Sequence, residues 1–199
     1  MSGFSRKRNG EILATFSHYE GAILKSLTEQ ILELLGEGDA PADPLLAVVG
    51  ISSNDSLPED PVLARLLPDA YQDAADSAEF RRYTEHSARE KKRAHAHAIR
   101  DILMENLGEH SLDLTQPGLN KREELHFILP EEKAQMWLMG INDMRLALGT
   151  RLNVAADAQE KFAALNDENP DKGIYNLLAW LGWLQEILLD VITVENPKK

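Results

Sequence analysis

The chain has 199 residues, no cysteine and a formal net charge of -12. With 43% hydrophobic and 27% charged residues it has the composition of a globular protein that can bury a core, so we expect a single domain over residues 1–199. The absence of cysteine excludes disulfides, thiolate metal sites and cysteine nucleophiles. The acidic balance argues against non-specific nucleic-acid binding by the whole molecule, because phosphate contacts dominate that affinity.

The N-terminal third predicts a hairpin, a helix and a long loop. Residues 4–8 and 11–16 are strand-like and flank Asn9 and Gly10, a strong signal for a β-hairpin over residues 4–16. After the hairpin, apolar residues recur at helical spacing, which predicts a helix, and Gly36 is a suitable residue to end it. The segment 36–60, rich in Gly, Pro, Ser and Asp, is predicted to be a long loop.

The remaining residues predict a helical core over residues 61–193. Asp60 and Pro61 are a good cap and first residue for a short helix, and Pro130 opens another. The expected elements, in chain order, are helices near 61–67 and 76–107, a loop over 108–122, a short strand over 123–129, and helices over 130–152, 155–165 and 171–193. The fold class is therefore mainly α: a helical bundle with a small N-terminal β-hairpin.

Charge is strongly segregated in the long helix. The window 81–100 holds seven Lys or Arg and two Glu, a net charge of +5, which leaves -17 for the rest of the chain. Residues three or four apart form one stripe along this helix, comprising Arg82, His86, Arg89, Arg93, His97 and Arg100. A neighbouring face, comprising Phe80, Tyr83, Ala94, Ala98 and Ile102, is expected to be buried. We interpret the stripe as a partner-binding face for DNA phosphates or an acidic protein surface. The alternative is that it balances the chain's own acids within the fold or a dimer.

No metal, cofactor or catalytic site is expected. His95 and His97 are two residues apart, which turns them about 200° from each other on a helix, so they cannot share one ion. His86 and Glu90 supply only two ligands. Glu123 and His126 form a single Glu-x-x-His in a strand-like context, whereas a di-iron bundle needs two on helices. Phosphate-binding glycine loops, nucleophile elbows and His-Glu-x-x-His motifs are absent, so we expect no enzyme.

Two further groups of residues in the helical core have alternative interpretations. Asn142, Asp143 and Arg145 lie in an otherwise apolar helix, so they must find partners. We expect a structural network in which Asp143 or a neighbouring acid pairs with Arg145, and a ligand pocket is the alternative. Trp180 and Trp183 flank Gly182 and are predicted to form a homodimer interface, with the protein core as the alternative.

The chain is expected to be cytoplasmic. The basic N-terminus has no apolar run behind it and is not a secretory signal. The most apolar segment, 174–192, carries Asn176, Gln185, Glu186 and Asp190, which are costly in hydrocarbon, so no membrane association is expected.

Three phrases carry a resemblance to a known family. They are LLPDAY at 66–71, EFRRYTE at 79–85 and NDMRLALGTRL at 142–152, followed by the Trp-rich segment 177–189. With these phrases the chain resembles an actinobacterial family catalogued as a domain of unknown function. Its members are often encoded beside the ClpS adaptor of the Clp protease and near sulfur-assimilation genes. The resemblance covers residues 4 to about 192.

The resemblance implies a mainly helical, non-enzymatic transcriptional regulator that responds to oxidative stress through an intramolecular disulfide. This chain departs from that pattern because it has no cysteine. Met136, Met139 and Met144 could be oxidised, but they lie on a helix predicted to be buried. We therefore expect a regulator that binds RNA polymerase, a sigma factor or DNA through the basic stripe. The alternative is a protein-interaction module of the ClpS/Clp system.

Overall fold

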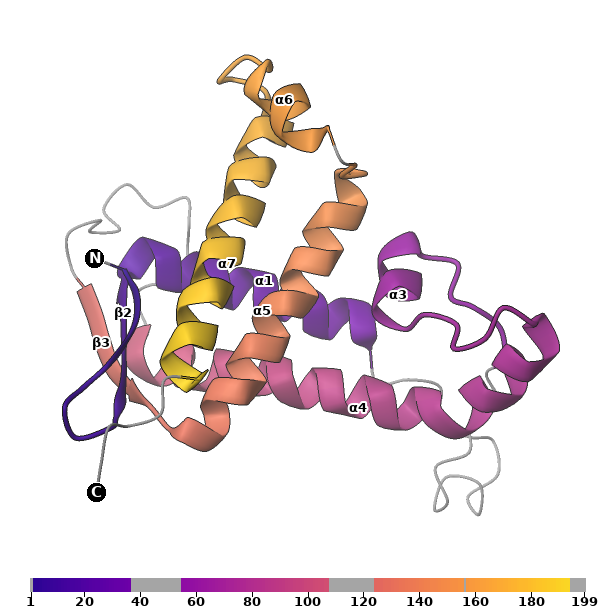
Figure 1. Cartoon of the computed structure of the whole chain (residues 1–199), viewed down its shortest axis with the longest axis horizontal. Coiled ribbons are helices and arrows are strands. Elements are labelled where there is room, and N and C mark those ends of the chain that lie inside the picture. The colour runs from indigo at the N-terminus through magenta and orange to yellow at the C-terminus, as the bar shows by residue number, and fades with distance from the viewer. Residues whose placement is uncertain (1, 37–54, 108–123, 156, 194–199) are drawn as a thin grey trace.

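The computed structural model of the chain describes residues 2–36, 55–107, 124–155 and 157–193 (Figure 1). These residues form six helices and three strands, and the mainly α fold class with a minor β part is confirmed. In chain order the elements are β1 (Gly3–Arg6), β2 (Ile12–Ser17), α1 (His18–Leu35), α3 (Pro61–Leu66), α4 (Ala74–Leu107), β3 (Glu124–Leu129), α5 (Glu131–Arg151), α6 (Ala158–Ala163) and α7 (Pro170–Thr193). Most of the expected loops at 36–60 and 108–122 lie outside the described residues.

The predicted hairpin is present and gains a third strand. β1 and β2 pair antiparallel, and the turn between them contains Gly10 at a φ of 89°, a conformation that favours glycine. β3, more than a hundred residues further along the chain, pairs antiparallel with the other edge of β2, so that Ala14 faces Phe127. The sheet order is therefore β1-β2-β3. The sequence predicted β3 as a short strand but not its place in the sheet.

An aromatic cluster joins the sheet to α5. Each strand contributes one phenylalanine to its inner face, and these three rings surround the fully buried Trp137 of α5. The centroid of the Trp137 ring lies 5.8 Å from Phe4, 6.3 Å from Phe16 and 5.8 Å from Phe127. The indole N–H donates to the backbone oxygen of Ala98 in α4 at 3.2 Å, so the buried polar atom is satisfied.

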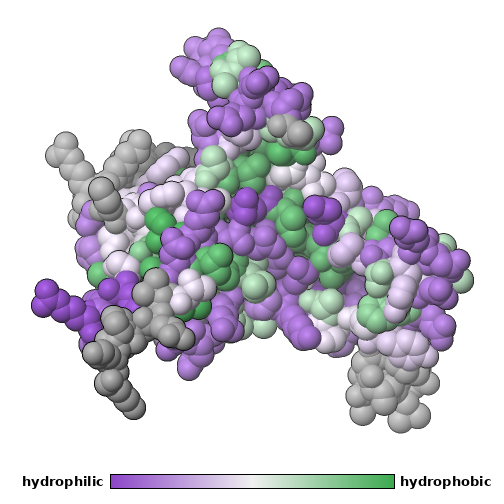
Figure 2. Space-filling view, viewed as in Figure 1, coloured by the Kyte–Doolittle hydropathy of each residue, from purple (hydrophilic) through white to green (hydrophobic). Residues whose placement is uncertain are grey.

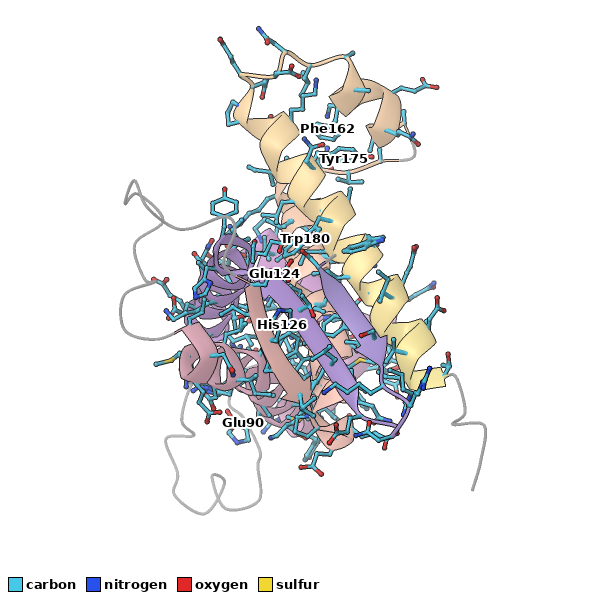
Figure 3. All side chains as sticks on the ribbon, turned by 90° about the vertical axis from the view of Figure 1, so that its left-hand side faces the viewer. Glu90, Glu124, His126, Phe162, Tyr175 and Trp180 are labelled. Carbon is cyan, nitrogen blue, oxygen red and sulfur yellow. The ribbon has the colours of Figure 1, made fainter. Side chains whose placement is uncertain are left out.

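The helices form two crossed pairs. α1 and α4 run antiparallel along the long axis of the molecule, and α5 and α7 cross them steeply and project to one side, with α6 at the tip (Figure 1). At that tip the rings of Phe162 and Tyr175 stack with centroids 4.6 Å apart (Figure 3). No helix of the described residues is long and apolar enough to cross a membrane.

Two glycines of α5 lie in different surroundings, so substituting each of them tests how tightly the helix is packed at that position. A Cβ at Gly140 would lie 2.5 Å from the Cδ1 of the fully buried Ile99, whereas a Cβ at Gly149 would meet nothing within 4 Å. Gly140→Ala should therefore lower the free energy of unfolding by about 1–3 kcal/mol through overpacking. Gly149→Ala, the matched control, should raise it by roughly 0.5–1 kcal/mol through helix propensity. Urea denaturation measures both, and equal effects of the two substitutions would contradict this packing.

Candidate functional site

The inward face of α4 carries charged side chains in its N-terminal half. Arg81, Glu85 and Arg89 are buried, with relative exposures of 5%, 5% and 7%. They are spaced four residues apart, so they follow one another along the same side of the helix. The C-terminal half of the same face is apolar and includes Ile99 and Leu103, both fully buried.

The prediction of which face of α4 is buried was wrong for the first half of the helix. Phe80 and Tyr83 were expected in the core but are 43% and 55% exposed, and Ala94 is exposed. Of the same set, Ala98 is buried and Ile102 is half-buried. The prediction failed because it assigned apolar residues to the inside, whereas here paired charges occupy the inside and aromatic residues face outward.

Glu85 is held between the two buried arginines. Its carboxylate accepts hydrogen bonds from Arg81 Nη1 and Arg89 Nη2, each at 2.7 Å. Arg81 also donates to Asp69 at 2.9 Å and to the backbone oxygen of Leu67 at 3.0 Å. Burial alone would raise the pKa of Glu85, but the hydrogen bonds and Coulombic attraction of Arg81 and Arg89 outweigh it, so the pKa lies below its ordinary value.

Two arginines of α4 cap the C-terminal end of α1. Arg89 Nη1 donates to the backbone oxygen of Leu35, and Arg93 Nη1 donates to that of Gly36. Gly36, at a φ of 58°, ends the helix as expected, and its N–H bonds back to the carbonyls of Leu32 and Glu33. α1 has no basic residue in its own last turn. The two cations therefore satisfy carbonyl groups and lie at the negative end of the helix dipole.

The structure consequently divides the predicted basic stripe. Arg89 is buried and bonded within the fold, and Arg93 is half-buried against Gly36 and Glu90. Arg100 pairs with its neighbour Asp101 at 2.8 Å, and His97 is half-buried. Arg82 and His86 are exposed. For Arg89 the geometry is that of the alternative interpretation, in which the stripe serves the chain's own fold.

The outward side of α4 near its N-terminus is aromatic as well as cationic. The rings of Tyr71 and Phe80 meet edge to face with centroids 5.6 Å apart, and both are about half exposed. Tyr83 is exposed one turn further along, next to Arg82. We call Tyr71, Phe80, Arg82, Tyr83 and His86 the outer α4 face.

Asn142, Asp143 and Arg145 belong to two separate networks. Asp143, 3% exposed, accepts from Lys92 of α4 at 2.6 Å. On the other side of α5, Arg145 Nη1 donates to Gln185 of α7, and the Gln185 amide donates to Asn142 at 3.5 Å. The expected direct pairing of Asp143 with Arg145 is absent. No carboxylate of the described residues lies within 4 Å of the Arg145 guanidinium.

His95 lies beside the Lys92–Asp143 pair. Its Nδ1 is buried and has no hydrogen-bond partner among the described residues. Burial lowers the pKa of His95 below its ordinary value of 6.5, and the positive charges of Lys92 and Lys91 lower it further, against the opposing attraction of Asp143. The folded protein therefore favours the neutral imidazole.

The two tryptophans of α7 differ in their surroundings. Trp183 packs over β1, where a Cβ on Gly3 would lie 3.4 Å from its ring, yet it is 42% exposed. Trp180 is half-buried and lines a hollow of about 470 Å³ with Tyr19, Ile23 and Leu177 (Figure 3). The predicted homodimer interface at these residues stays a prediction.

The histidines that the sequence places near acidic residues, on α4 and on β3, lie far from one another. His126 lies on the exposed side of β3, 3.3 Å from Glu124, while Glu90 projects from α4 elsewhere on the molecule (Figure 3). Glu123 lies outside the described residues. Within the described residues no three His, Asp or Glu side chains are grouped as metal ligands would be.

Glu85, Lys92 and Gln185 hold these networks together and were not among the functional residues predicted from the sequence. For Glu85 a signal existed, because the Arg81, Glu85 and Arg89 spacing of four is that of consecutive helical ion pairs. Lys92 and Gln185 pair with residues forty or more positions away, which no local pattern reveals.

Glu85→Gln tests the buried charges. Removing the carboxylate charge leaves the buried guanidinium of Arg89 without an acidic partner and that of Arg81 with Asp69 alone, so the free energy of unfolding should fall by about 3 kcal/mol. Glu90→Gln removes an exposed partner of Arg93 and should change it by less than about 1 kcal/mol. The depressed pKa of Glu85 stabilises the fold above about pH 4.5, and this contribution is lost as the pH falls further. Urea denaturation from pH 7 to pH 3 should therefore show a flatter profile for Glu85→Gln, and matching profiles would contradict the assignment.

His95→Leu tests the neutral imidazole. Because the pKa of His95 is depressed in the folded state, its contribution to stability is complete above pH 6.5 and is lost as the pH falls, when the unfolded chain takes up a proton that the fold resists. The variant should lose less stability than the wild type between pH 6.5 and pH 5. Thermal unfolding across this range measures the difference, and identical slopes would refute the burial of a neutral His95.

Comparison with known proteins places the chain in a family. A family described as a domain of unknown function (DUF2017) matches residues 1–192. The oxidative stress regulator AosR of Mycobacterium tuberculosis is 30% identical over 196 residues, which cover 90% of this chain and 81% of the relative, and AosR of Mycobacterium bovis gives the same values. A Mycobacterium leprae protein that carries the AosR name provisionally is 34% identical over 188 residues, 86% of this chain and 77% of the relative. No solved structure matches. The chain therefore belongs to the DUF2017 family and is related to mycobacterial proteins named for the regulation of oxidative stress.

Proposed function

We propose that this protein is a non-enzymatic regulator that binds a protein partner with an acidic surface through the outer α4 face. The single observation that carries the proposal is the set of exposed aromatic and cationic side chains on this face. Tyr and Arg are, with Trp, enriched among the residues that contribute most to binding at protein interfaces, because each combines a large apolar area with a polar end. The names of the relatives support a regulatory role.

The buried charges support the proposal because they make the face rigid. Arg81, Glu85 and Arg89 tie this part of α4 to α1 and to the segment that follows α3. The exposed residues on the opposite side of the same turns are thereby presented by an ordered helix, which lowers the entropy lost on binding. Arg82 itself has no acidic partner within 4 Å among the described residues, so its charge is available.

An acidic protein fits this face better than DNA does. A chain with a net charge of -12 repels DNA, a uniformly charged polyanion, more strongly at long range than a protein whose acidic surface is a local patch, and Arg89 and Arg93 of the original stripe are engaged within the fold. RNA polymerase or a sigma factor is the partner class that we propose. The chain has no cysteine, so a disulfide switch cannot operate in it. The link to the ClpS/Clp system stays a prediction.

A charge-reversed outer face tests the proposal. The variant Arg82→Glu, Tyr83→Ala, His86→Glu should bind the partner at least tenfold more weakly, because it loses the Arg82 cation and an aromatic contact and gains two carboxylates. Its helical content and melting temperature should match the wild type, since all three side chains are exposed. Affinity purification from native cells followed by mass spectrometry identifies the partner, and titration of the purified pair measures the affinity.

Arg151→Glu is the matched control, because Arg151 is an exposed arginine on α5, a different helix. It should leave the affinity unchanged. Equal binding by the triple variant and the wild type would reject the proposed face. A salt titration separates the partner classes: for duplex DNA the logarithm of the affinity falls with the logarithm of the salt concentration with a slope of about -0.9 for each phosphate contacted. Such a slope with DNA, without binding to the polymerase or sigma factor, would replace the protein partner with DNA.

A further inference from the structure

We propose that the cleft between α3, α5 and α7 binds a small organic anion, a molecule with an apolar body and one carboxylate or phosphate group. The cleft encloses about 560 Å³, a volume typical of small-molecule sites. Its walls include Arg65 from α3, Asn142, Arg145, Leu146 and Gly149 from α5, and Leu178 from α7. Figure 2 shows apolar and strongly hydrophilic surface side by side over α5, between α7 and α3.

The charge of the cleft is opposite to that of the molecule. Acidic residues outnumber basic ones by 33 to 21 in the chain, yet among the described residues two arginines and no carboxylate line this cleft. Arg145 donates to the neutral side chain of Gln185, so a partly buried guanidinium lacks a counter-charge among the described residues. A carboxylate or phosphate supplies that charge and matches the planar guanidinium geometry.

Arg145 is also held in place before any ligand arrives. Gln185 accepts from its Nη1 and donates to Asn142, so the two polar groups on α5 are oriented from α7. The face of the guanidinium lies against Gly182, where a Cβ would be 3.6 Å from Nη2. A cation fixed in this way loses little freedom when it binds an anion.

The C-terminal end of α5 does not use the positive charge of the two arginines in the cleft. Asn153, at a φ of 48°, and Val154 close the helix by donating to the carbonyls of Thr150 and Gly149. The arginines are therefore not needed to cap α5. Leu146, Val154 and Leu178 supply apolar surface beside them. Three elements enclose the cleft, which favours a compact ligand over an extended peptide.

Naphthalene derivatives test the site with one ring and three head groups. 1-Naphthoate carries a carboxylate, 1-naphthyl phosphate carries a phosphate and 1-naphthol is uncharged. Titration calorimetry on the full chain should show saturable binding of at least one anion and at least tenfold weaker binding of 1-naphthol. The better anion identifies the head group, carboxylate or phosphate, that the arginines prefer.

Substitutions locate the binding. Gly149→Leu places a side chain in open space within the cleft and should abolish binding of the anion. Gly173→Leu, at another helical glycine with nothing within 4 Å of its Cβ, is the matched control and should bind as the wild type does. Arg145→Gln and Arg65→Gln should each weaken the anion about tenfold and leave 1-naphthol unchanged, and a melting temperature for each variant verifies folding.

Three results would overturn the proposal: no anion binding at millimolar concentration, equal binding of 1-naphthol and the anions, or wild-type affinity in Gly149→Leu. The proposal is independent of the outer α4 face. The triple variant of that face should bind the naphthalene anion as the wild type does, so failure of one proposal is distinguishable from failure of the other.

Discussion

The arrangement of this fold depends on Glu85, a buried carboxylate between two arginines on one side of α4. Buried guanidinium groups without a counter-charge would be strongly unfavourable, and Glu85 supplies the buried counter-charge that Arg81 and Arg89 share, with Asp69 as a second partner of Arg81. Arg89 is then able to reach the C-terminal end of α1, and Arg81 reaches the segment after α3. One line of charges therefore connects the N-terminal half of α4 to the end of α1 and to the segment that follows α3.

This use of charge explains the surface of α4. Because arginines and a glutamate occupy the inner side of its first half, the aromatic residues of that half remain outside. Some residues of the window 81–100, which has a net charge of +5, therefore stabilise the fold, and others form part of the surface. The inner residues of this window cap α1 and form ion pairs. The outer residues, above all Arg82 with Tyr83, lie beside exposed aromatic rings.

One turn of α5 lies between α4 on one side and α7 with the cleft on the other. Asp143 faces α4 and pairs with Lys92, while Asn142 and Arg145 face α7 and the cleft. The same short segment thereby contributes to both sides of the helix crossing. Of the two charged residues in this turn, Asp143 is paired with Lys92, whereas Arg145 has no counter-charge among the described residues.

The sequence by itself determined the elements of this protein. Apolar spacing, capping residues such as Asp60 and the stop at Gly36 placed the helices within a few residues of their observed bounds, because these signals act within one or two turns. The hairpin at Asn9 and Gly10 was likewise local. The three phrases that resemble the family were sufficient to indicate the DUF2017 membership that comparison then showed.

The tertiary structure alone decided which side of α4 is inside, where β3 joins the sheet and which partners Asp143 and Arg145 have. Apolar patterning assumes that buried faces are hydrophobic, and it fails where charges are buried in pairs. Met139, on a helix predicted to be buried, is 47% exposed because α5 meets its neighbours on only part of its surface. Such outcomes depend on contacts between residues far apart in the chain, and no local spacing contains them.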